Sequence, residues 1–516
     1  MSTQKLLDYN REDHAADDDM AFGNTPITVM GRPIGGGQQQ QQPTSSDYTK
    51  GEDQGNHFRD VGFGVLYYLN LFAIIAVAAV YGPDALSKSD DGEDTDPVDD
   101  TSDDSVSSYD GYIYVGVVCG ISSLLLSGLS FSVMTRMAEF LIKFSLLFSV
   151  GLSGLLCLVS FASGNFIGGI VGLIFFALFV CYAFSVWSRI PFATANLVTA
   201  IAAIRANFGV GLAAYIFVIV GFAWTILWTI AFVGASDASE RCSPKEDENG
   251  VEIEGEETCS GNGFYFFLLL ISFYWVHQVL TNTLIVTVAG TVGTWWFAPE
   301  EANSCCSQGV RDSFMRATTY SFGSICFGSL IVAIIQALKT LVEMARNEEG
   351  QDSILLCVVD CILGCIQGLV EYFNKWAFIY VGLYGYAYCE AGKNVMNLFK
   401  ARGWEAIIVD DLTDMVFGMV SFAIGLITGA IGIVLKESTT WFNENKDDGL
   451  DPTWGTFFLG LIVGWIIASI LMGTISSAVN TVIVLFAEAP AEFDQNHNEL
   501  SRKMRAAYLE YHPGSL

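Results

Sequence analysis

The stretch "WGTFFLGLIVGWIIASILMGTISSAVNTVIVLF", residues Trp454 to Phe486, holds 33 residues and no charged side chain. An α-helix of about 20 apolar residues crosses the hydrocarbon core of a bilayer, which is roughly 30 Å thick. Phe63–Tyr81 and Gly209–Ala235 are two further uncharged runs of about this length. Soluble domains do not repeat such runs, so the sequence predicts an all-α, polytopic bundle of transmembrane helices.

The whole chain has the composition of a membrane protein. Of its 516 residues 52% are hydrophobic and 16% charged, and the mean hydropathy is +0.43. Soluble domains carry about 25% charged residues. We predict ten spans, at residues 62–82, 111–131, 144–162, 165–187, 209–234, 263–290, 319–342, 374–395, 413–435 and 454–487.

An even number of spans places both termini on one side of the membrane. Short cytosolic loops of membrane proteins are enriched in lysine and arginine. The bases that fall on the side of the termini are Arg136, Lys143, Arg189, Arg205, Arg311, Arg316, Lys393, Lys400 and Arg402. Both termini are therefore predicted to be cytosolic.

Residues 353–373, "SILLCVVDCILGCIQGLVEYF", are apolar but interrupted by Asp360 and Glu371. They could form an eleventh span, which would move the C-terminus outside, or an amphipathic or re-entrant helix at the interface. The bases Arg502, Lys503 and Arg505 suit a cytosolic C-terminus. This favours the interfacial helix.

The formal net charge of −30 is concentrated in a few acidic blocks of the N-terminal region and two loops. Such blocks are typical of solvated segments and argue against nucleic acid as a partner. Three regions are predicted: a disordered acidic cytosolic tail (1–60), a transmembrane, transporter-like domain (61–490) and a cytosolic C-terminal tail (491–516).

Most of the 12 cysteines lie within or beside the predicted spans, but two do not. Cys242 and Cys259 lie in the acidic loop after the fifth span, which the predicted topology places outside the cytosol. Disulfides persist in that compartment, so these two cysteines are predicted to pair.

Glycines recur at four-residue spacing within spans, as in Gly425 and Gly429. Small residues at this spacing let helices approach closely in lipid. Packing within the chain is favoured over dimerisation.

The sequence contains no phosphate-binding loop, nucleophile elbow or HExxH zinc motif. We therefore expect no enzymatic activity, no catalytic residues, no cofactor and no metal site.

The stretch "KWAFIYVGLYGYAYCEAGKNVMNLFK", Lys375 to Lys400, combines an apolar character with many aromatic rings and one acid. Aromatic faces attract organic cations, and a desolvated contact is worth about 2 kcal/mol. A carboxylate would add the opposite charge. The predicted substrate-binding residues are Trp187, Tyr274, Trp275, Tyr380, Tyr384 and Glu390.

His277 is a candidate proton carrier, because ionisable groups inside membranes are usually functional. Two plainer readings stay open. The rings could belong to the interfacial aromatic belt of membrane proteins, and His277 could be a hydrogen-bonded structural histidine.

Three segments resemble the choline transporter-like family: "WSRIPFATANLVTAIAAIRAN" (187–207), "RDSFMRATTYSFGSICFGSLIVAIIQALKTLVE" (311–343) and "NKWAFIYVGLYGYAYCEAGKNVMNLF" (374–399). In the third, Tyr384, Gly385 and Cys389 keep the family signature. The resemblance covers about residues 60 to 490. Tyr388, Glu390 and Lys393 depart from the signature, and the short first extracellular loop is more like fungal and protist members.

This resemblance implies transport of choline or a related organic cation by alternating access, without ATP hydrolysis. The membrane potential or proton exchange would drive it. The alternative is a membrane scaffold or lipid-interacting protein on the same fold, since fold does not fix function. The expected partners are the organic cation and the lipid bilayer, and the sequence carries no signal for the oligomeric state. The expected location is the cell membrane, with an internal membrane as the alternative.

Overall fold

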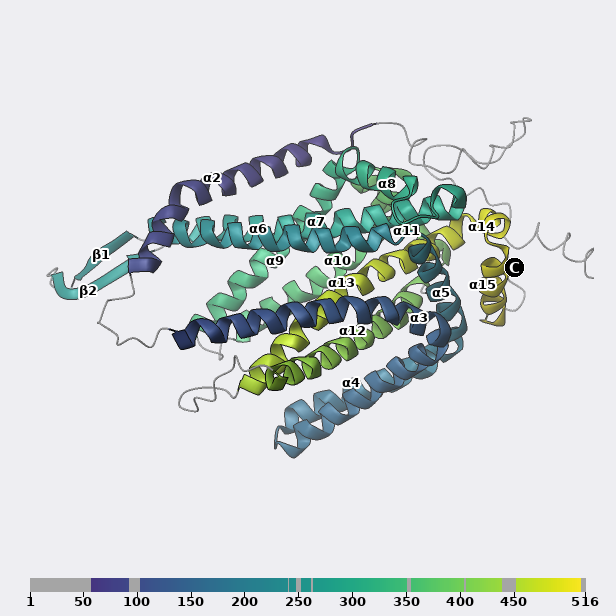
Figure 1. The fold of residues 1–516 in the computed structure, drawn as a ribbon, viewed down its shortest axis with the longest axis horizontal. Coiled ribbons are helices and arrows are strands. Elements are labelled where there is room, and N and C mark those ends of the chain that lie inside the picture. The colour runs from purple at the N-terminus through teal and green to yellow at the C-terminus, as the bar shows by residue number, and fades with distance from the viewer. Residues whose placement is uncertain are drawn as a thin grey trace, which may run out of the picture.

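The computed structural model describes residues 57–91, 103–239, 241–246, 252–260, 263–349, 354–402, 405–438 and 452–511. Most of the predicted N-terminal tail lies outside these residues. The long helices are α2 (Val61–Asp91), α3 (Asp103–Ala162), α4 (Phe166–Val186), α6 (Gly209–Ser239), α7 (Gly263–Phe297), α9 (Phe322–Glu349), α10 (Ile354–Tyr384), α12 (Glu405–Ser438) and α13 (Pro452–Glu488). They form an elongated bundle (Figure 1).

The described residues contain nine helices that are long and apolar enough to cross a membrane. One of these stretches, Gly111–Ala162, has 52 residues and includes Met137, where the backbone leaves helical geometry (φ −124°, ψ 24°). This kink divides α3 into two segments of roughly 25 residues, each long enough for a crossing. With α3 counted as two segments, the described part of the chain holds ten candidate spans in a helical, polytopic fold.

The shorter helices gather at one end of the bundle (Figure 1). They are α5 (Ile190–Ala206), α8 (Gln308–Thr318), α11 (Tyr388–Arg402), α14 (Pro490–Asn496) and α15 (Asn498–Tyr511). We call this end the basic end, because most of the bases predicted to be cytosolic lie on these elements or beside them. The 3₁₀ turns η2 (Trp187–Arg189) and η3 (Pro299–Glu301) precede α5 and α8.

A β-hairpin lies at the opposite end, between α6 and α7 (Figure 1). Its strands β1 (Arg241–Glu246) and β2 (Glu252–Ser260) are antiparallel, and their register pairs Cys242 with Cys259. The register thus supports the predicted disulfide, which stays a prediction.

The interfacial helix predicted at 353–373 is wrong, and so is the span at 374–395. Residues 354 to 384 form one continuous helix, α10, of which Leu355–Tyr384 is a candidate span. Its acids have partners: Arg346 Nη1 of α9 donates to Asp360 Oδ2 at 3.0 Å, and Gln336 Nε2 of α9 donates to Glu371 Oε1 at 3.0 Å. These contacts lower the free-energy cost of placing both acids in the membrane.

Glycines allow α12 and α13 to approach closely. A Cβ added at Gly432 would lie 2.4 Å from the Thr456 carbonyl oxygen, and one at Gly460 would lie 2.6 Å from the Thr428 carbonyl oxygen. The Thr428 hydroxyl donates across this interface to the Gly460 carbonyl at 2.9 Å. The small residues therefore pack within the chain, as predicted.

Candidate functional site

The first candidate site forms where α10 ends. Tyr380 and Tyr384 lie four residues apart and so share one face of α10. Both hydroxyls donate to Glu488, the last residue of α13: Tyr380 to Oε1 and Tyr384 to Oε2, each at 2.5 Å. A single carboxylate thereby fixes two rings of another helix.

A third ring joins this pair after the helix break. Gly385 has φ +63°, a left-handed conformation that glycine adopts without strain, and it ends α10. The ring of Tyr386 lies 5.6 Å from that of Tyr384, which lies 5.9 Å from that of Tyr380. We call these three tyrosines and Glu488 the tyrosine–Glu488 cluster.

The phenol of Tyr386 is neutral at physiological pH. Its burial raises its pKa to about 12, and the nearby Glu488 and Glu390 carboxylates act in the same direction. The cluster therefore presents a neutral phenol ring at the break, close to negative charge.

The residues before α2 hold the break in place. The Asp60 carboxylate (Oδ2) accepts hydrogen bonds from the backbone N–H of Tyr388 at 3.0 Å and from the Ser324 hydroxyl at 2.6 Å. Tyr388 begins α11, and a carboxylate at a helix N-terminus is favourable. Arg59 Nε donates to the Gly385 carbonyl at 3.3 Å, so the chain on both sides of the break is tied to residues 59 and 60.

The acid bonded to the tyrosines is one that sequence reasoning missed. Glu390 was predicted to supply the carboxylate, but it lies in the first turn of α11, and Glu488 bonds both hydroxyls. A signal for Glu488 was present, since it is the first charged residue after the uncharged residues 452–487.

The other predicted residues lie elsewhere in this conformation. Tyr274 and Trp275 of α7 bond to α9, through the Thr340 hydroxyl at 2.8 Å and the Cys326 carbonyl at 2.9 Å. Trp187, in η2, is 44% exposed. Of the six predicted binding residues, the structure brings Tyr380 and Tyr384 together around one acid.

His277 is a residue of α7, and its side chain contacts α6. Its Nε2 is 3.2 Å from the Thr225 hydroxyl of α6, and its Nδ1 is 3.0 Å from the Phe273 carbonyl. Both ring nitrogens have a partner, as a structural histidine would.

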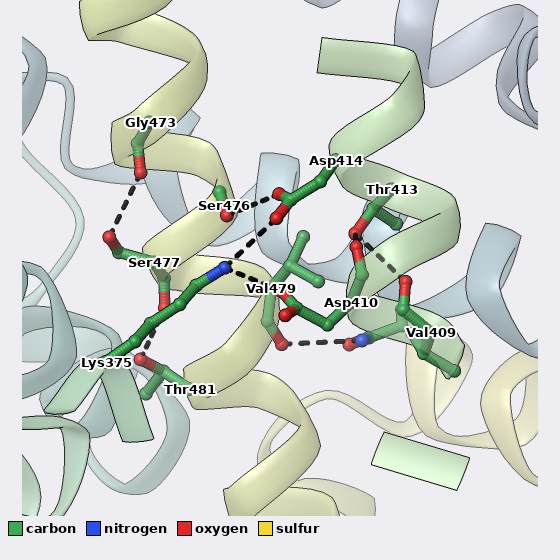
Figure 2. Close-up of polar contacts among 11 residues, drawn as sticks. Lys375, Val409, Asp410, Thr413, Asp414, Gly473, Ser476, Ser477, Val479 and Thr481 are labelled. Carbon is green, nitrogen blue, oxygen red and sulfur yellow. Dashed lines mark hydrogen bonds and ion pairs between the residues drawn. The ribbon is translucent and has the colours of Figure 1, made fainter. Parts of the chain in front are cut away.

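A second candidate site links α10, α12 and α13 (Figure 2). Lys375 Nζ lies 2.8 Å from Asp410 Oδ1 and 3.2 Å from Asp414 Oδ2. The Ser476 hydroxyl of α13 donates to Asp414 Oδ1 at 2.8 Å. The exposed fraction of the side chain is 3% for Asp410, 20% for Lys375 and 47% for Asp414. We call these four residues the Lys375 cluster.

Sequence reasoning also missed this cluster. Lys375 was read as the edge of a span, whereas it lies well inside α10. Asp410 precedes the predicted span 413–435 and Asp414 lies at its start, whereas α12 already begins at Glu405 and carries both acids. Within the described residues, no group of three or more His, Cys, Asp or Glu side chains is arranged to hold a metal ion.

A family model described as "Plasma-membrane choline transporter" matches residues 170–491. This chain belongs to the choline transporter-like family. Protein PNS1 of Mycosarcoma maydis is 33% identical over 399 residues, covering 76% of this chain and 73% of that protein. A CTL-like protein of Dictyostelium discoideum is 29% identical over 421 residues, covering 80% of this chain and 71% of that protein.

A second fungal relative, Protein PNS1 of Gibberella zeae, is 32% identical over 348 residues. The aligned region covers 66% of this choline transporter-like chain and 62% of that protein. The resemblance to fungal and protist members is thus confirmed. The matched region 170–491 contains both the tyrosine–Glu488 cluster and the Lys375 cluster.

Proposed function

We propose that this chain carries choline or a related organic cation across a membrane by alternating access, and that the tyrosine–Glu488 cluster recognises the cation at the basic end. The observation that supports this most is the pair of 2.5 Å hydrogen bonds from Tyr380 and Tyr384 to the two oxygens of Glu488. They hold two aromatic rings beside one carboxylate.

This combination suits a quaternary ammonium ion. Such an ion is weakly hydrated and cannot donate hydrogen bonds from its nitrogen, so recognition depends on ring faces and opposite charge. Each desolvated ring contact contributes about 2 kcal/mol. The carboxylate adds an attraction that the low dielectric of the bundle strengthens.

The helix break lies at the end of the spanning helix α10, and a few residues at the end of an element are a usual place for a hinge in a moving site. Here the break lies between α10 and α11, directly beside Tyr384 and Tyr386. Its contacts to Asp60 and Arg59 also connect the cluster to the start of α2.

The driving force needs no ATP. Moving one positive charge through 100 mV is worth about 2.3 kcal/mol, which corresponds to roughly 50-fold accumulation inside a negative compartment.

The test is uptake of radiolabelled choline into proteoliposomes with an imposed inside-negative potential. We expect saturable uptake that follows the potential. Glu488→Gln keeps the size of the side chain and removes the charge, so the KM for choline should rise about tenfold or more, which corresponds to 1.4 kcal/mol or more.

Glu390→Gln is the matched control, since it removes a nearby acid that is not bonded to Tyr380 or Tyr384, and its KM should stay within about twofold of the wild type. Size-exclusion profiles establish that each variant is folded. No uptake by folded wild-type protein would contradict choline transport and favour a membrane scaffold. An unchanged KM in Glu488→Gln would show that the tyrosine–Glu488 cluster does not recognise choline.

A further inference from the structure

The Lys375 cluster lies deeper in the bundle than Glu488. Lys375 is nine residues before Tyr384, the end of α10, and Asp414 is nine residues after Glu405, the start of α12. Both helix ends are at the basic end, and nine residues of helix measure about 14 Å. The cluster therefore lies inside the candidate spans Leu355–Tyr384 and Ile408–Ser438, about 14 Å from the end of α10.

The charges of the cluster do not balance. Lys375 carries one positive charge and faces two carboxylates, so the three groups together carry a net charge of −1. The neighbouring Asp411 accepts a hydrogen bond from the Tyr182 hydroxyl, and Arg189 lies close to that hydroxyl, so this acid has a base of its own nearby. An excess negative charge inside a membrane is costly, and either a proton on one carboxylate or one further cation would offset it.

Further polar groups of α13 surround the cluster. Asn480 is fully buried, and its side-chain amide lies beside the Asp410 carboxylate. The hydroxyls of Ser477 and Thr481 donate to carbonyls of their own helix, at 3.0 and 2.7 Å.

The two carboxylates differ in access. Asp410 is almost fully buried and has the shorter contact to Lys375, whereas half of Asp414 is exposed and its contact is longer. An exposed carboxylate at this depth must face water rather than lipid. Asp414 is therefore the acid that a cation entering from solution reaches.

We propose that Asp414 is a second cation station on the transport path, which the Lys375 ammonium occupies until the transported organic ammonium takes its place. Lys375 then stays with Asp410, and the two acids and two cations are neutral together. This inference rests on the proposed function, because it assigns the station to the same cation that the tyrosine–Glu488 cluster recognises.

The proposal gives two substitutions opposite effects on apparent affinity. Asp414→Asn removes the station, so the KM for choline uptake should rise about fivefold or more, equivalent to about 1 kcal/mol. Lys375→Met removes the internal competitor, so the KM should fall about fivefold, and kcat should fall as well because release slows. Asp411→Asn is a control on the same helix, and its KM and kcat should both stay within about twofold of the wild-type values.

Equilibrium binding of tetramethylammonium to the purified protein repeats the comparison without transport. The double variant Lys375→Met/Asp410→Asn keeps the net charge at −1, and it tests the station if Lys375→Met does not fold. A purely structural ion pair would lower the yield of the variants and leave the KM of the folded fraction unchanged. That result, or a raised KM in the Lys375 variants, would contradict the proposal that Asp414 is a cation station, even if the wild type takes up choline. Absence of uptake by the wild type overturns the proposed function and the station with it.

Discussion

Three charged or titratable side chains at the basic end each make a specific contact with another element. Glu488 bonds two tyrosines, Asp60 bonds the first N–H of α11, and His497 of the loop between α14 and α15 stacks on Trp295 with ring centroids 3.8 Å apart. Each contact depends on the identity of the side chain, so the protein is sensitive to substitution at each of these residues, and His497 also makes it sensitive to pH.

His497 should make the folded protein less stable in acid. Burial lowers the pKa of its imidazole, and the hydrogen bond from Nε2 to the Trp295 carbonyl, at 2.9 Å, offsets part of that effect. An unfolded histidine titrates near pH 6.5. Below that pH the unfolded chain binds the proton more readily, so this contribution to stability is complete above about pH 6.5 and is lost as the pH falls toward the folded pKa.

The measurement is the Tm of the purified protein between pH 7.5 and 5. We expect the Tm of His497→Gln to fall less over this range than that of the wild type. His57→Gln, at an exposed histidine, should follow the wild-type profile. Parallel profiles for the wild type and His497→Gln would show that His497 does not contribute.

At the scale of elements, the break between α10 and α11 is the feature on which the tyrosine–Glu488 cluster depends. It requires Gly385 in the left-handed region and Asp60 at the start of α11. The first half of α10, by contrast, has a face that no other element of the described residues covers. Leu355 and Leu369 are more than 70% exposed, and an added Cβ at Gly364 would meet no atom within 4 Å. Only the second half of the helix is tied to the site.

Gly385→Ala should destabilise the break. An L-residue in the left-handed region costs about 1–2 kcal/mol, and relief of this strain would move Tyr384 and Tyr386 away from their present positions. We expect a lower Tm and a raised KM for choline.

Gly364→Ala is the matched control in the same element. In a helix interior alanine is favoured over glycine by about 0.5–1 kcal/mol, so the Tm should stay the same or rise. Equal effects of the two substitutions on the KM would mean that the break does not position the cluster.

For the whole molecule, ten spanning segments place the hairpin and the basic end on opposite faces (Figure 1). The basic residues predict a cytosolic basic end. The hairpin, with Cys242 opposite Cys259, would then lie in an oxidising compartment.

This topology predicts how cysteines react in intact cells. A membrane-impermeant maleimide should not label Cys242 or Cys259 in the wild type, because they form a disulfide, but it should label Cys259 in Cys242→Ser. Cys305, exposed between α7 and α8, should react only after the membrane is permeabilised. Labelling of Cys305 in sealed cells would show that the basic end lies outside the cytosol, opposite to the predicted topology. Labelling of both hairpin cysteines in the wild type would contradict the disulfide.

The sequence by itself determined the fold class and the family. Bilayer thickness and helix rise fix how long an apolar run must be, and both are properties of a local stretch. The prediction that aromatic rings of residues 375–400 gather around an acid also found Tyr380 and Tyr384, because their i, i+4 spacing puts them on one face of a helix.

Only the tertiary structure decided which charges are tolerated and which acid the tyrosines meet. Glu488 is 108 residues from Tyr380, Asp410 is 35 residues from Lys375, and the partner of Asp360 is on the preceding helix. A charge can lie in a membrane only if a partner offsets its loss of hydration, and nothing local in the sequence names that partner. For this reason the two acids of 353–373 led to a wrong prediction of an interfacial helix, and the sequence did not connect Lys375 with Asp410 and Asp414.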